Sequence, residues 1–336
     1  MQERGSSDPR DHPVKILVYI VSEPVWTIPP EQVARLQEAF PAHAFVNAGS
    51  EREALAEASG ADVVFSSMLT PEIVRAASRL RWVHSPAAGV GRLLFPELRD
   101  SDIVLTNSRG LHANPIAEHV FGLAIALSRH FHVAMRRQAE RVFAKDEIGQ
   151  VRVLHGRRLG IIGLGAIGSA VARLGVAFGM KVCAVRRRPE APAPPGVEQV
   201  FGPSQVDDLL KISDYVVLSA PLTPETSGLV GLRELRLMKP DAYLINVARG
   251  KLVREAELAD ALAHRVIAGA GLDVFEHEPL PPSSPLWDLP NVIITPHTSG
   301  FTERYWEEAS DLFADNLRRD DRGEPLFNVV DKRAGY

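Results

Sequence analysis

The second half of the chain carries four charged or titratable side chains, each close behind a segment that predicts a β-strand. Arg249 follows one such segment, Asp273 ends the next, and His297 follows the last. Glu278 comes five residues after Asp273. In an open α/β sheet, ligands bind beyond the carboxyl ends of the strands, so these groups should share one edge of the sheet. The pattern therefore predicts a chemical site at that edge.

These four residues have the chemistry needed for hydride transfer to a 2-oxo acid. Arg249 can hold a carboxylate and polarise a carbonyl through its planar fork of N–H donors. The alkoxide that forms needs a proton, which His297 can supply, and Glu278 can orient that imidazole and favour its charged form. Asp273 is better placed to bond a nicotinamide carboxamide. Each residue alone could be structural, but their occurrence together favours a catalytic set.

A glycine-rich segment upstream predicts the cofactor. Residues 163–168, GLGAIG, follow a predicted strand and open a predicted helix, which is the setting of a dinucleotide-binding loop. Gly163 permits the turn, Gly165 lets a pyrophosphate approach, and Gly168 lets helix and strand pack closely. The helix N-terminus, with Ala166 and Ile167, offers free N–H groups to the anion. The alternative is a tight turn that binds no ligand. Such a turn does not require a strand before the glycines and a helix after them, so this setting favours the dinucleotide-binding loop.

The end of the next predicted strand bears on the choice between NADP and NAD. An Asp or Glu that would hold the ribose 2′-hydroxyl is missing there, and Arg186, Arg187 and Arg188 stand in its place, ahead of Glu190. Guanidinium groups bind phosphate by bidentate, charge-assisted hydrogen bonds. The run favours NADP(H), with NAD(H) as the alternative if the arginines are only a solvated surface cluster.

The elements that must position these residues alternate between strands and helices. Such alternation predicts an α/β protein with two doubly wound parallel sheets, each Rossmann-like or flavodoxin-like. A long apolar helix over 115–131, with Asn114 as its cap, should lie at a domain junction or a subunit contact. In the first part the expected strands are 14–21, 61–65 and 81–85, and the helices are 30–40 and 71–80. In the second part about six strands are expected, at 158–163, 180–185, 215–220, 242–247, 266–274 and 291–296, with helices at 166–179, 206–212 (capped by Ser204), 232–238 and 255–263.

Composition limits the remaining possibilities. A length of 336 residues predicts two domains, and a formal net charge of −4 gives no reason to expect nucleic acid. The single cysteine, Cys183, argues against a disulfide framework or a thiolate metal site, and we expect no metal at His130 and His132 either. No apolar run is long enough to span a membrane. Residues 1–13 suggest a disordered tail without a signal peptide, so we expect a cytoplasmic protein.

Several motifs occur together in the order and spacing of one family. GLGAIG, PLTPETSGLV, NVARG, GLDVFEHEPL and ITPHTSG make the chain resemble the D-isomer-specific 2-hydroxyacid dehydrogenases, from about residue 61 to NVVD near the end. The resemblance implies a catalytic set of Arg249, Glu278 and His297. It also implies a substrate domain split between 1–107 and 300–336, with a cofactor domain of residues 108–299 inserted, and a cleft that closes over substrate. Members are usually homodimers.

The resemblance adds further site residues. The AGV stretch of the family provides backbone N–H groups to the substrate carboxylate, so Ala88 and Gly89 should line the substrate together with Arg249 and His297. Three positions depart from the family pattern. Gly91 stands where an Asp is usual and Ser219 where a His is frequent. Arg254 stands where VDE is expected after the arginine motif. The expected cofactor contacts are Gly163, Gly165, Ala166, Ile167, Gly168, Arg186, Arg187, Arg188, Ala220, Pro221, Val247, Ala248, Arg249, Asp273, His297 and Gly300.

We therefore expect an NAD(P)-dependent enzyme that interconverts a 2-oxo acid and a D-2-hydroxy acid, similar to glyoxylate and hydroxypyruvate reductases. Two alternatives stay open. One is a formate or phosphite dehydrogenase of the same family, which would oxidise those substrates with NAD. The other is a dinucleotide-sensing protein similar to the corepressors of this family, which would bind dinucleotide without turnover.

Overall fold

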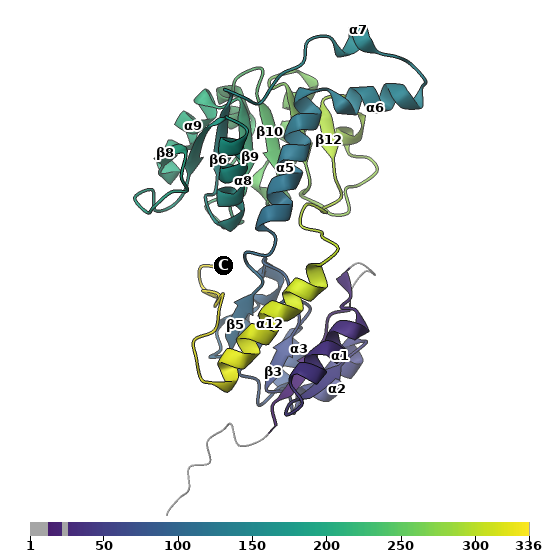
Figure 1. The fold of residues 1–336 in the computed structure, drawn as a ribbon, viewed down its shortest axis with the longest axis vertical. Coiled ribbons are helices and arrows are strands. Elements are labelled where there is room, and N and C mark those ends of the chain that lie inside the picture. Colours follow the sequence, from purple (N-terminus) through teal and green to yellow (C-terminus); the bar gives the residue numbers. More distant parts are fainter. Residues whose placement is uncertain (1–12, 22–25, 336) are drawn as a thin grey trace, which may run out of the picture. The chain divides into compact units, whose positions relative to one another are not determined.

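A computed structural model describes residues 13–21 and 26–335, so almost all of the predicted N-terminal tail lies outside the described residues (Figure 1). The chain forms two compact units. Unit 1 combines residues up to 111 with residues from 302 onward, and unit 2 is the continuous stretch 112–301. The two ends of unit 2 meet, because Nδ1 of His112 lies 3.3 Å from the carbonyl oxygen of Gly300.

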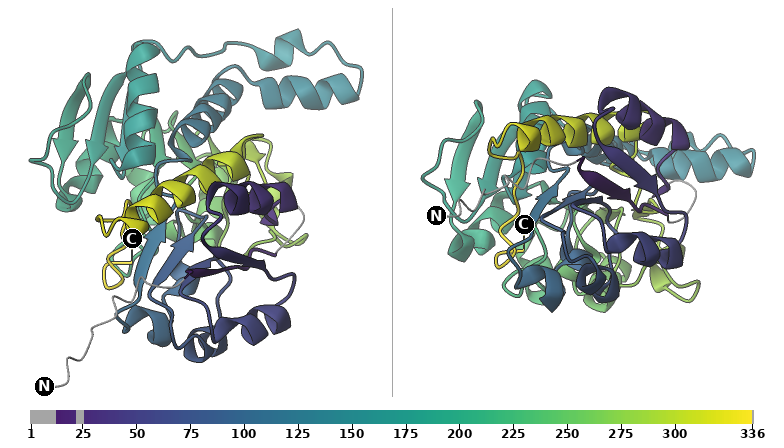
Figure 2. Two further views of the ribbon diagram at one scale, coloured as in Figure 1. Left: turned by 60° about the horizontal axis from the view of Figure 1, so that its bottom comes forward. Right: turned by 90° about the horizontal axis from the view of Figure 1, so that it is seen from below.

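Unit 1 is built on a five-stranded parallel sheet in the order β2-β1-β3-β4-β5, the order of flavodoxin-like folds. One face is covered by α2 and α3 and the other by α1 and α12, which contact each other although they come from opposite ends of the chain (Figures 1 and 2). The strands are β1 Lys15–Val18, β2 Ala44–Asn47, β3 Val63–Phe65, β4 Trp82–Ser85 and β5 Val104–Asn107. The helices are α1 Pro30–Ala39, α2 Glu51–Ala58, α3 Pro71–Ala76, α4 Pro96–Arg99 and α12 Tyr305–Asp321, with a 3-10 turn η2 at Gly91–Leu93.

The C-terminal return completes the core of unit 1. Phe313 of α12 is fully buried and stacks on Phe65 of β3 and Trp82 of β4 at centroid distances of 4.5 and 5.3 Å. Offset aromatic pairs and the apolar area that they bury stabilise such a contact. The helix α12 is therefore an integral part of unit 1.

Unit 2 is built on a seven-stranded parallel sheet in the order β12-β11-β10-β9-β6-β7-β8. The strand order reverses between β6 and β9, and such a switch point is where open α/β sheets bind ligands. The strands are β6 Arg158–Ile162, β7 Lys181–Val185, β8 Val197–Phe201, β9 Tyr215–Leu218, β10 Tyr243–Asn246, β11 Gly269–Leu272 and β12 Val292–Ile294.

Helices cover both faces of this sheet, as its buried strands require. One apolar cluster joins α5 and α8 to the sheet, and a second cluster joins α9, α10 and α11 to the opposite face (Figure 1). The helices are α5 Ala113–Ser128, α6 Phe131–Ala139, α7 Lys145–Ile148, α8 Ala166–Ala177, α9 Val206–Ile212, α10 Leu232–Leu237 and α11 Glu255–Ala263. The 3-10 turns are η3 Pro203–Gln205, η4 Gly250–Leu252 and η5 Pro285–Asp288.

The structure confirms the predicted fold class and corrects some elements. β2, β5 and α2 were not predicted, and β8 raises the second sheet from about six strands to seven. Neither predicted cap forms: α5 begins one residue before Asn114, whose oxygen accepts a hydrogen bond from Arg173, and Ser204 lies inside η3. Among the described residues, every helix is too short or too polar to cross a membrane.

Candidate active site

The glycine loop of unit 2 joins β6 to α8. Gly163 has a φ of 106°, and a Cβ there would lie 2.5 Å from the backbone nitrogen of Ala220, so only glycine fits. A Cβ at Gly168 would overlap the carbonyl oxygen of Gly163. At Gly165, in contrast, a Cβ would meet nothing within 4 Å. The first and third glycines are thus required by close packing, and the middle one faces open space.

The start of α8 is suited to an anion. The backbone N–H groups of Ala166 and Ile167 donate to no acceptor within the described residues. The first turn carries no acidic side chain that would compete for these donors. A helix N-terminus with free N–H groups and a positive dipole end binds phosphate. Ser219, at the end of β9, supports the loop, because its Oγ donates to the carbonyl oxygen of Gly163 at 2.7 Å.

The arginine run follows β7 directly. Nη1 of Arg186 donates to the carbonyl oxygen of Pro192 at 3.2 Å, which leaves its Nε and Nη2 buried without a hydrogen-bond partner among the described residues. A buried, unpaired guanidinium nitrogen is costly, and an anion would satisfy it. Arg187 and Arg188 are exposed.

Arg249 lies just beyond the carboxyl end of β10. The side chain of Asn246 holds its segment, since Nδ2 donates to the carbonyl oxygen of Arg249 at 3.0 Å and Oδ1 accepts from the N–H of Ala248 at 3.1 Å. A Cβ at Gly250 would overlap the backbone of Phe275, so the Arg249 segment contacts the segment that leads to Glu278. Arg249 is exposed as a residue, although burial around its guanidinium lowers the pKa below its ordinary value. Its Nη1 donates to the carbonyl oxygen of Ala248, and its other side-chain N–H groups donate to no acceptor within the described residues.

Glu278 and His297 form a hydrogen-bonded pair. Nδ1 of His297 lies 2.7 Å from Oε2 of Glu278, and Oε1 of Glu278 accepts the N–H of Phe275 at 3.0 Å. The two side chains are 47% and 36% exposed, so a small molecule can reach the imidazole. Because a carboxylate accepts at Nδ1, that nitrogen carries a proton. Nε2 of His297 has no partner among the described residues and is free for a proton transfer.

The charge state of Glu278 fits this pairing. Partial burial raises its pKa, but hydrogen bonds from His297 and from the N–H of Phe275, with the positive charges of His297 and Arg249, together outweigh burial. The pKa of Glu278 therefore lies below its ordinary value, and the carboxylate is ionised at neutral pH.

The segment 295–300, which carries His297, is held by Asp273. Oδ1 of Asp273 accepts from Oγ1 of Thr295 at 2.6 Å and from the N–H of Thr298 at 3.0 Å, and Oδ2 accepts from the N–H of Ser299 at 3.1 Å. The Asp273 side chain is fully buried. Its oxygens shape this segment, and Oδ2 accepts one hydrogen bond where a carboxylate oxygen can accept two, so the expected contact of Asp273 with the nicotinamide carboxamide stays a prediction.

His297 itself has a left-handed backbone with a φ of 54°. Such a conformation is uncommon for a side-chain-bearing residue and persists only where its surroundings enforce it. Here the N–H of His297 donates to the carbonyl oxygen of Asp273 at 2.9 Å, next to the bonds just described. His119 of α5 adds a contact at 2.9 Å between its Nε2 and Oγ1 of Thr295. Sequence analysis assigned no role to Thr295 or His119. Thr295 lies in the ITPHTSG motif, but its hydrogen bond to Asp273 joins residues 22 positions apart, and His119 lies in the apolar helix outside the motifs.

In unit 1, Ala88 and Gly89 lie in the loop after β4. The N–H groups of both residues donate to no acceptor within the described residues, and Gly89 is exposed. Two adjacent free N–H groups are suited to a carboxylate. The structure thus brings Arg249, Glu278, His297 and the glycine loop to one edge of the unit 2 sheet, and places Ala88 and Gly89 at an edge of the unit 1 sheet.

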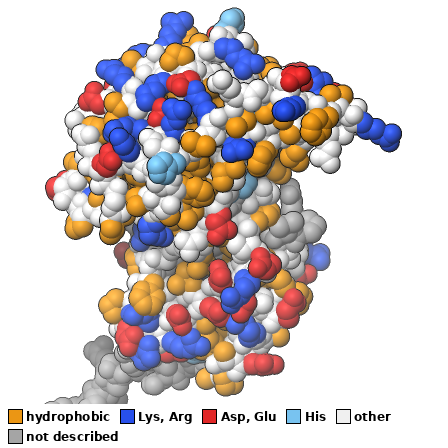
Figure 3. Space-filling model, turned by 45° about the horizontal axis from the view of Figure 1, so that its top comes forward, with side chains coloured by type: hydrophobic (Ala, Val, Ile, Leu, Met, Phe, Trp, Pro, Cys, Tyr) orange, Lys and Arg blue, Asp and Glu red, His pale blue; other side chains and the backbone are white. Residues whose placement is uncertain are grey.

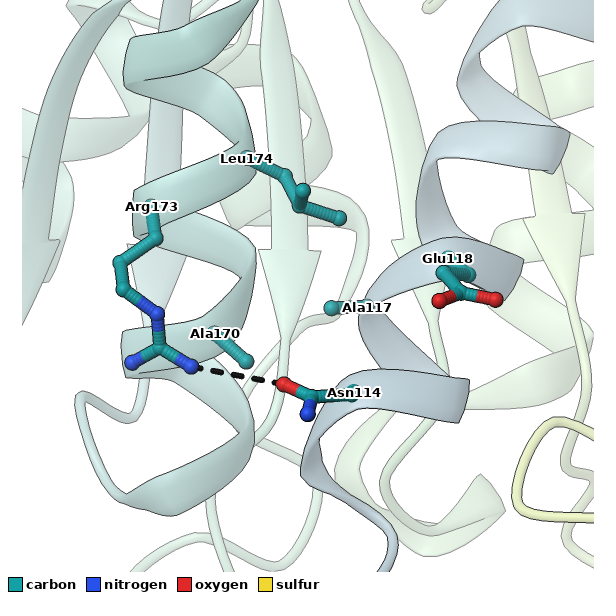
Figure 4. A pocket seen from close by; sticks show the side chains of 6 residues that line it. All are labelled: Asn114, Ala117, Glu118, Ala170, Arg173 and Leu174. Carbon is teal, nitrogen blue, oxygen red and sulfur yellow. Dashed lines mark hydrogen bonds between the residues drawn. The ribbon is translucent and has the colours of Figure 1, made fainter.

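A pocket elsewhere on unit 2 does not involve these residues. It lies between α5 and α8, where Nη2 of Arg173 lies 3.4 Å from Oδ1 of Asn114 (Figure 4). Its lining residues are Asn114, Ala117, Glu118, Ala170, Arg173 and Leu174.

Comparisons with known proteins identify the family of this chain. Residues 121–299 match the NAD-binding domain of D-isomer specific 2-hydroxyacid dehydrogenases. The chain is 34% identical over 315 residues to a protein named glyoxylate reductase from Korarchaeum cryptofilum, covering 91% of this chain and 94% of that protein. This chain belongs to the D-isomer-specific 2-hydroxyacid dehydrogenase family. It is therefore an oxidoreductase of the NAD(P)-dependent 2-hydroxyacid dehydrogenases, as its motifs predicted.

Solved structures of family members are similar over nearly the whole chain. An NADPH-dependent glyoxylate/hydroxypyruvate reductase from Sinorhizobium meliloti, solved with NADP and sulfate, has a TM-score of 0.82 at 28% identity and covers 96% of this chain and 100% of its own. A D-lactate dehydrogenase from Aquifex aeolicus, complexed with NAD and lactic acid, has a TM-score of 0.76 at 27% identity and covers 94% and 99%. The family thus includes members that bind either dinucleotide.

Proposed function

We propose that this protein reduces a small 2-oxo acid to the D-2-hydroxy acid with NADPH. The observation that carries the proposal is the 2.7 Å pair of His297 and Glu278, at the same sheet edge as Arg249 and the glycine loop. A proton donor, an electrophile and a dinucleotide cradle are the parts that carbonyl reduction requires.

Each polar residue has a separate role in the proposed reaction. A reduced nicotinamide, held by the glycine loop and the start of α8, would supply the hydride for the carbonyl carbon. Arg249 polarises the carbonyl with the N–H groups that donate to no acceptor within the described residues. This stabilises the negative charge that develops on the carbonyl oxygen. His297 then gives the proton on Nε2 to that oxygen. Glu278 keeps Nδ1 protonated and stabilises the imidazolium form that is the proton donor.

The substrate carboxylate gives Ala88 and Gly89 their role. A 2-oxo acid carries its charge next to the reacting carbonyl, so an anion site made of backbone N–H groups selects it over a simple aldehyde. The free N–H groups of Ala88 and Gly89 support this assignment. The planar fork of Arg249 is also suited to binding a carboxylate.

The structure supports NADPH over NADH through Arg186. The residues fit a dinucleotide, because Gly165 faces open space and the first turn of α8 presents free N–H groups. The buried, unpaired Nε and Nη2 of Arg186 need an anion, which a 2′-phosphate would provide. Arg187 and Arg188 would add positive charge nearby. NADH would leave the nitrogens of Arg186 without a partner.

We also propose that the protein is a homodimer. α6 and α7 bury no side chain, and Phe131, Met135 and Phe143 are 49%, 69% and 95% exposed. Figure 3 shows hydrophobic side chains among basic ones on the face of unit 2 from which α6 and α7 extend. A second copy would cover this apolar surface, together with the predicted junction helix α5.

Loss of absorbance at the reduced-nicotinamide band tests the proposed activity. Glyoxylate, hydroxypyruvate and phenylpyruvate would each be offered with NADPH and with NADH, and the product would be analysed for chirality. We expect D-product and a preference for NADPH. Preference for NADH would contradict the role of Arg186. Turnover of formate or phosphite with NAD, or dinucleotide binding with no turnover at all, would favour one of the two alternative functions.

A further inference from the structure

The loop from Ser85 to Gly89 has two sides of opposite chemistry. The carbonyl oxygens of its first four residues each accept a hydrogen bond, whereas the N–H groups of Ala88 and Gly89 meet no acceptor in the described part of the chain. A trans peptide is planar, so the carbonyl of one residue points away from the N–H of the next. The donors to the carbonyls of Ala87 and Ala88 therefore fix where the N–H groups of Ala88 and Gly89 point, and the donors to the carbonyls of Ser85 and Pro86 anchor the start of the loop.

Asn107, the last residue of β5, and Ser108, the next residue, hold the two peptides that carry the free N–H groups of Ala88 and Gly89. Nδ2 of Asn107 donates to the carbonyl oxygen of Ala88 at 2.7 Å, which sets the direction of the next N–H, that of Gly89. The N–H of Ser108 reaches the carbonyl oxygen of Ala87 at 3.4 Å, and its Oγ reaches that of Ser85 at 3.1 Å. Asn107 and Ser108 are buried, so water cannot easily replace these donors.

Tyr305 supplies the fourth donor from the far end of the chain. Its hydroxyl donates to the carbonyl oxygen of Pro86 at 2.7 Å, across 219 residues of sequence. Trp26 and Trp306 pack edge-to-face on its ring at 5.1 and 5.0 Å. Burial raises the pKa of Tyr305 well above its ordinary value, so the hydroxyl keeps its proton at any working pH.

We propose that Asn107 and Tyr305 are positioning residues for substrate binding: they hold the carbonyl side of the loop so that its N–H side stays turned toward a carboxylate. This inference rests on the proposed function only for the identity of the ligand. It adds two residues that touch neither substrate nor cofactor, one of them from the C-terminal return.

The test compares two variants with a matched control. Asn107→Ala removes the donor to Ala88, and Tyr305→Phe removes one oxygen while keeping the ring. Tyr215→Phe in unit 2 is the control, since it also removes a buried hydroxyl, one bonded to Ser128 at 2.6 Å. The measurements are KM for glyoxylate, the inhibition constant of oxamate as an unreactive 2-oxo acid analogue, kcat, and the Kd of NADPH. Amide hydrogen exchange of residues 85–90 is followed in parallel.

We expect KM and the oxamate inhibition constant to rise together, roughly tenfold in Asn107→Ala and three- to fivefold in Tyr305→Phe. The kcat and the NADPH Kd should stay within about twofold of wild type, because the loop provides binding that is the same in ground and transition states. Exchange at residues 85–90 should quicken in both variants and stay unchanged in Tyr215→Phe. A loss of kcat and NADPH affinity in step with KM would indicate general damage and overturn the inference.

The same measurements distinguish failure of the proposed function from failure of the positioning role. If wild type reduces no 2-oxo acid while amide hydrogen exchange at residues 85–90 is still faster in both variants than in wild type, the positioning role holds and the substrate assignment is wrong. If wild type is active and both variants keep its KM, oxamate inhibition and exchange rates, the positioning role is wrong.

Discussion

At the scale of single residues, His297 is constrained twice, through its backbone and through its ring. The left-handed φ of 54° sets where Cβ points, and the bond from Nδ1 to Glu278 sets the rotation of the imidazole. Both constraints leave Nε2 as the one nitrogen available for chemistry. A substitution at this position therefore has to separate loss of the proton donor from relaxation of the backbone.

Replacing His297 with Asn makes that separation, because Asn also tolerates a left-handed backbone. We expect kcat of His297→Asn to fall about 100- to 10,000-fold, the usual contribution of general acid catalysis. The Kd of NADPH, measured by fluorescence titration, should stay within about twofold of wild type. Near-normal turnover would show that another group donates the proton.

Glu278→Gln tests the electrostatic role of the carboxylate. The pKa of Glu278 lies below its ordinary value, so in wild type the carboxylate is charged above about pH 4.5 and is lost only as pH falls through its lowered pKa. The amide of Gln cannot ionise, so the variant should have a lower kcat/KM than wild type at neutral pH and should lack the acidic limb that protonation of Glu278 causes. A pH profile of kcat/KM measures this. An acidic limb that persists in the variant would contradict the role of the ionised carboxylate.

His84 gives a residue-scale prediction about stability. Its side chain is fully buried, with Nδ1 at 2.7 Å from Oγ1 of Thr106, and burial lowers the pKa to about 3. Below about pH 6.5, His84 binds a proton in the unfolded chain but stays neutral in the folded chain. The free energy of unfolding therefore decreases as pH falls. From pH 6.5 to 5 the free energy of unfolding should drop by about 2 kcal/mol from this residue.

Urea unfolding of wild type and His84→Gln at pH 7.5, 6 and 5 measures the effect. The variant should be less stable at pH 7.5 but lose less stability on acidification. Parallel pH dependence in the two proteins would mean that His84 takes up a proton in the folded state.

At the scale of elements, sequence patterns predicted most buried strands and missed the half-exposed elements. They also missed β5, whose buried residues include the polar Thr106 and Asn107. Strands such as β10 are wholly buried and form continuous apolar runs, which the sequence displays. β2 and β8 lie at the edges of their sheets and contain exposed residues, among them Ala44, Glu198 and Gln199, so their patterns resemble loops. The helix α2 was missed because only Ala54 and Ala58 are buried in it.

The same reasoning explains what could be predicted of the site. Arg249, Glu278 and His297 follow buried strands, and parallel strands bring their carboxyl ends to one edge, so their proximity follows from topology. The hydrogen bonds that fix them do not, because Asp273 reaches Thr295 across 22 residues and Tyr305 reaches Pro86 across 219. Such long-range pairs leave no local pattern.

The helices α6 and α7 carry an element-scale prediction. Phe143→Asp and Met135→Glu place charges on the exposed apolar surface that a second copy is proposed to bury, so each should shift the protein from dimer to monomer. Leu55→Glu on α2 is the control, because Leu55 is also exposed, at 41%, but lies in unit 1. Light scattering coupled to size exclusion measures the mass. A monomeric wild type would contradict the proposed homodimer.

At the scale of the whole molecule, the chain holds one continuous unit and one discontinuous unit. Residues 112–301 contain both faces of the larger sheet and their helices. We expect the fragment 112–301 to fold alone, with a cooperative thermal transition by circular dichroism, and to bind NADPH. The fragment 1–111 lacks Phe313 and the rest of α12, and should not fold. A fragment 112–301 without a cooperative transition would contradict this division.

The contact between His112 and Gly300 has a consequence for how the chain folds. Bringing residues 111 and 302 together in an unfolded chain means closing a loop of about 190 residues, at an entropic cost on the order of 5 kcal/mol. Once residues 112–301 have folded, Nδ1 of His112 lies 3.3 Å from the carbonyl oxygen of Gly300. The contacts inside unit 2 then offset the entropic cost of closing the loop. The two parts of unit 1, residues up to 111 and residues from 302 onward, are then held close together, as if a short linker joined them. Synthesis order favours the same sequence of events, since α12 leaves the ribosome last and finds the insert already closed.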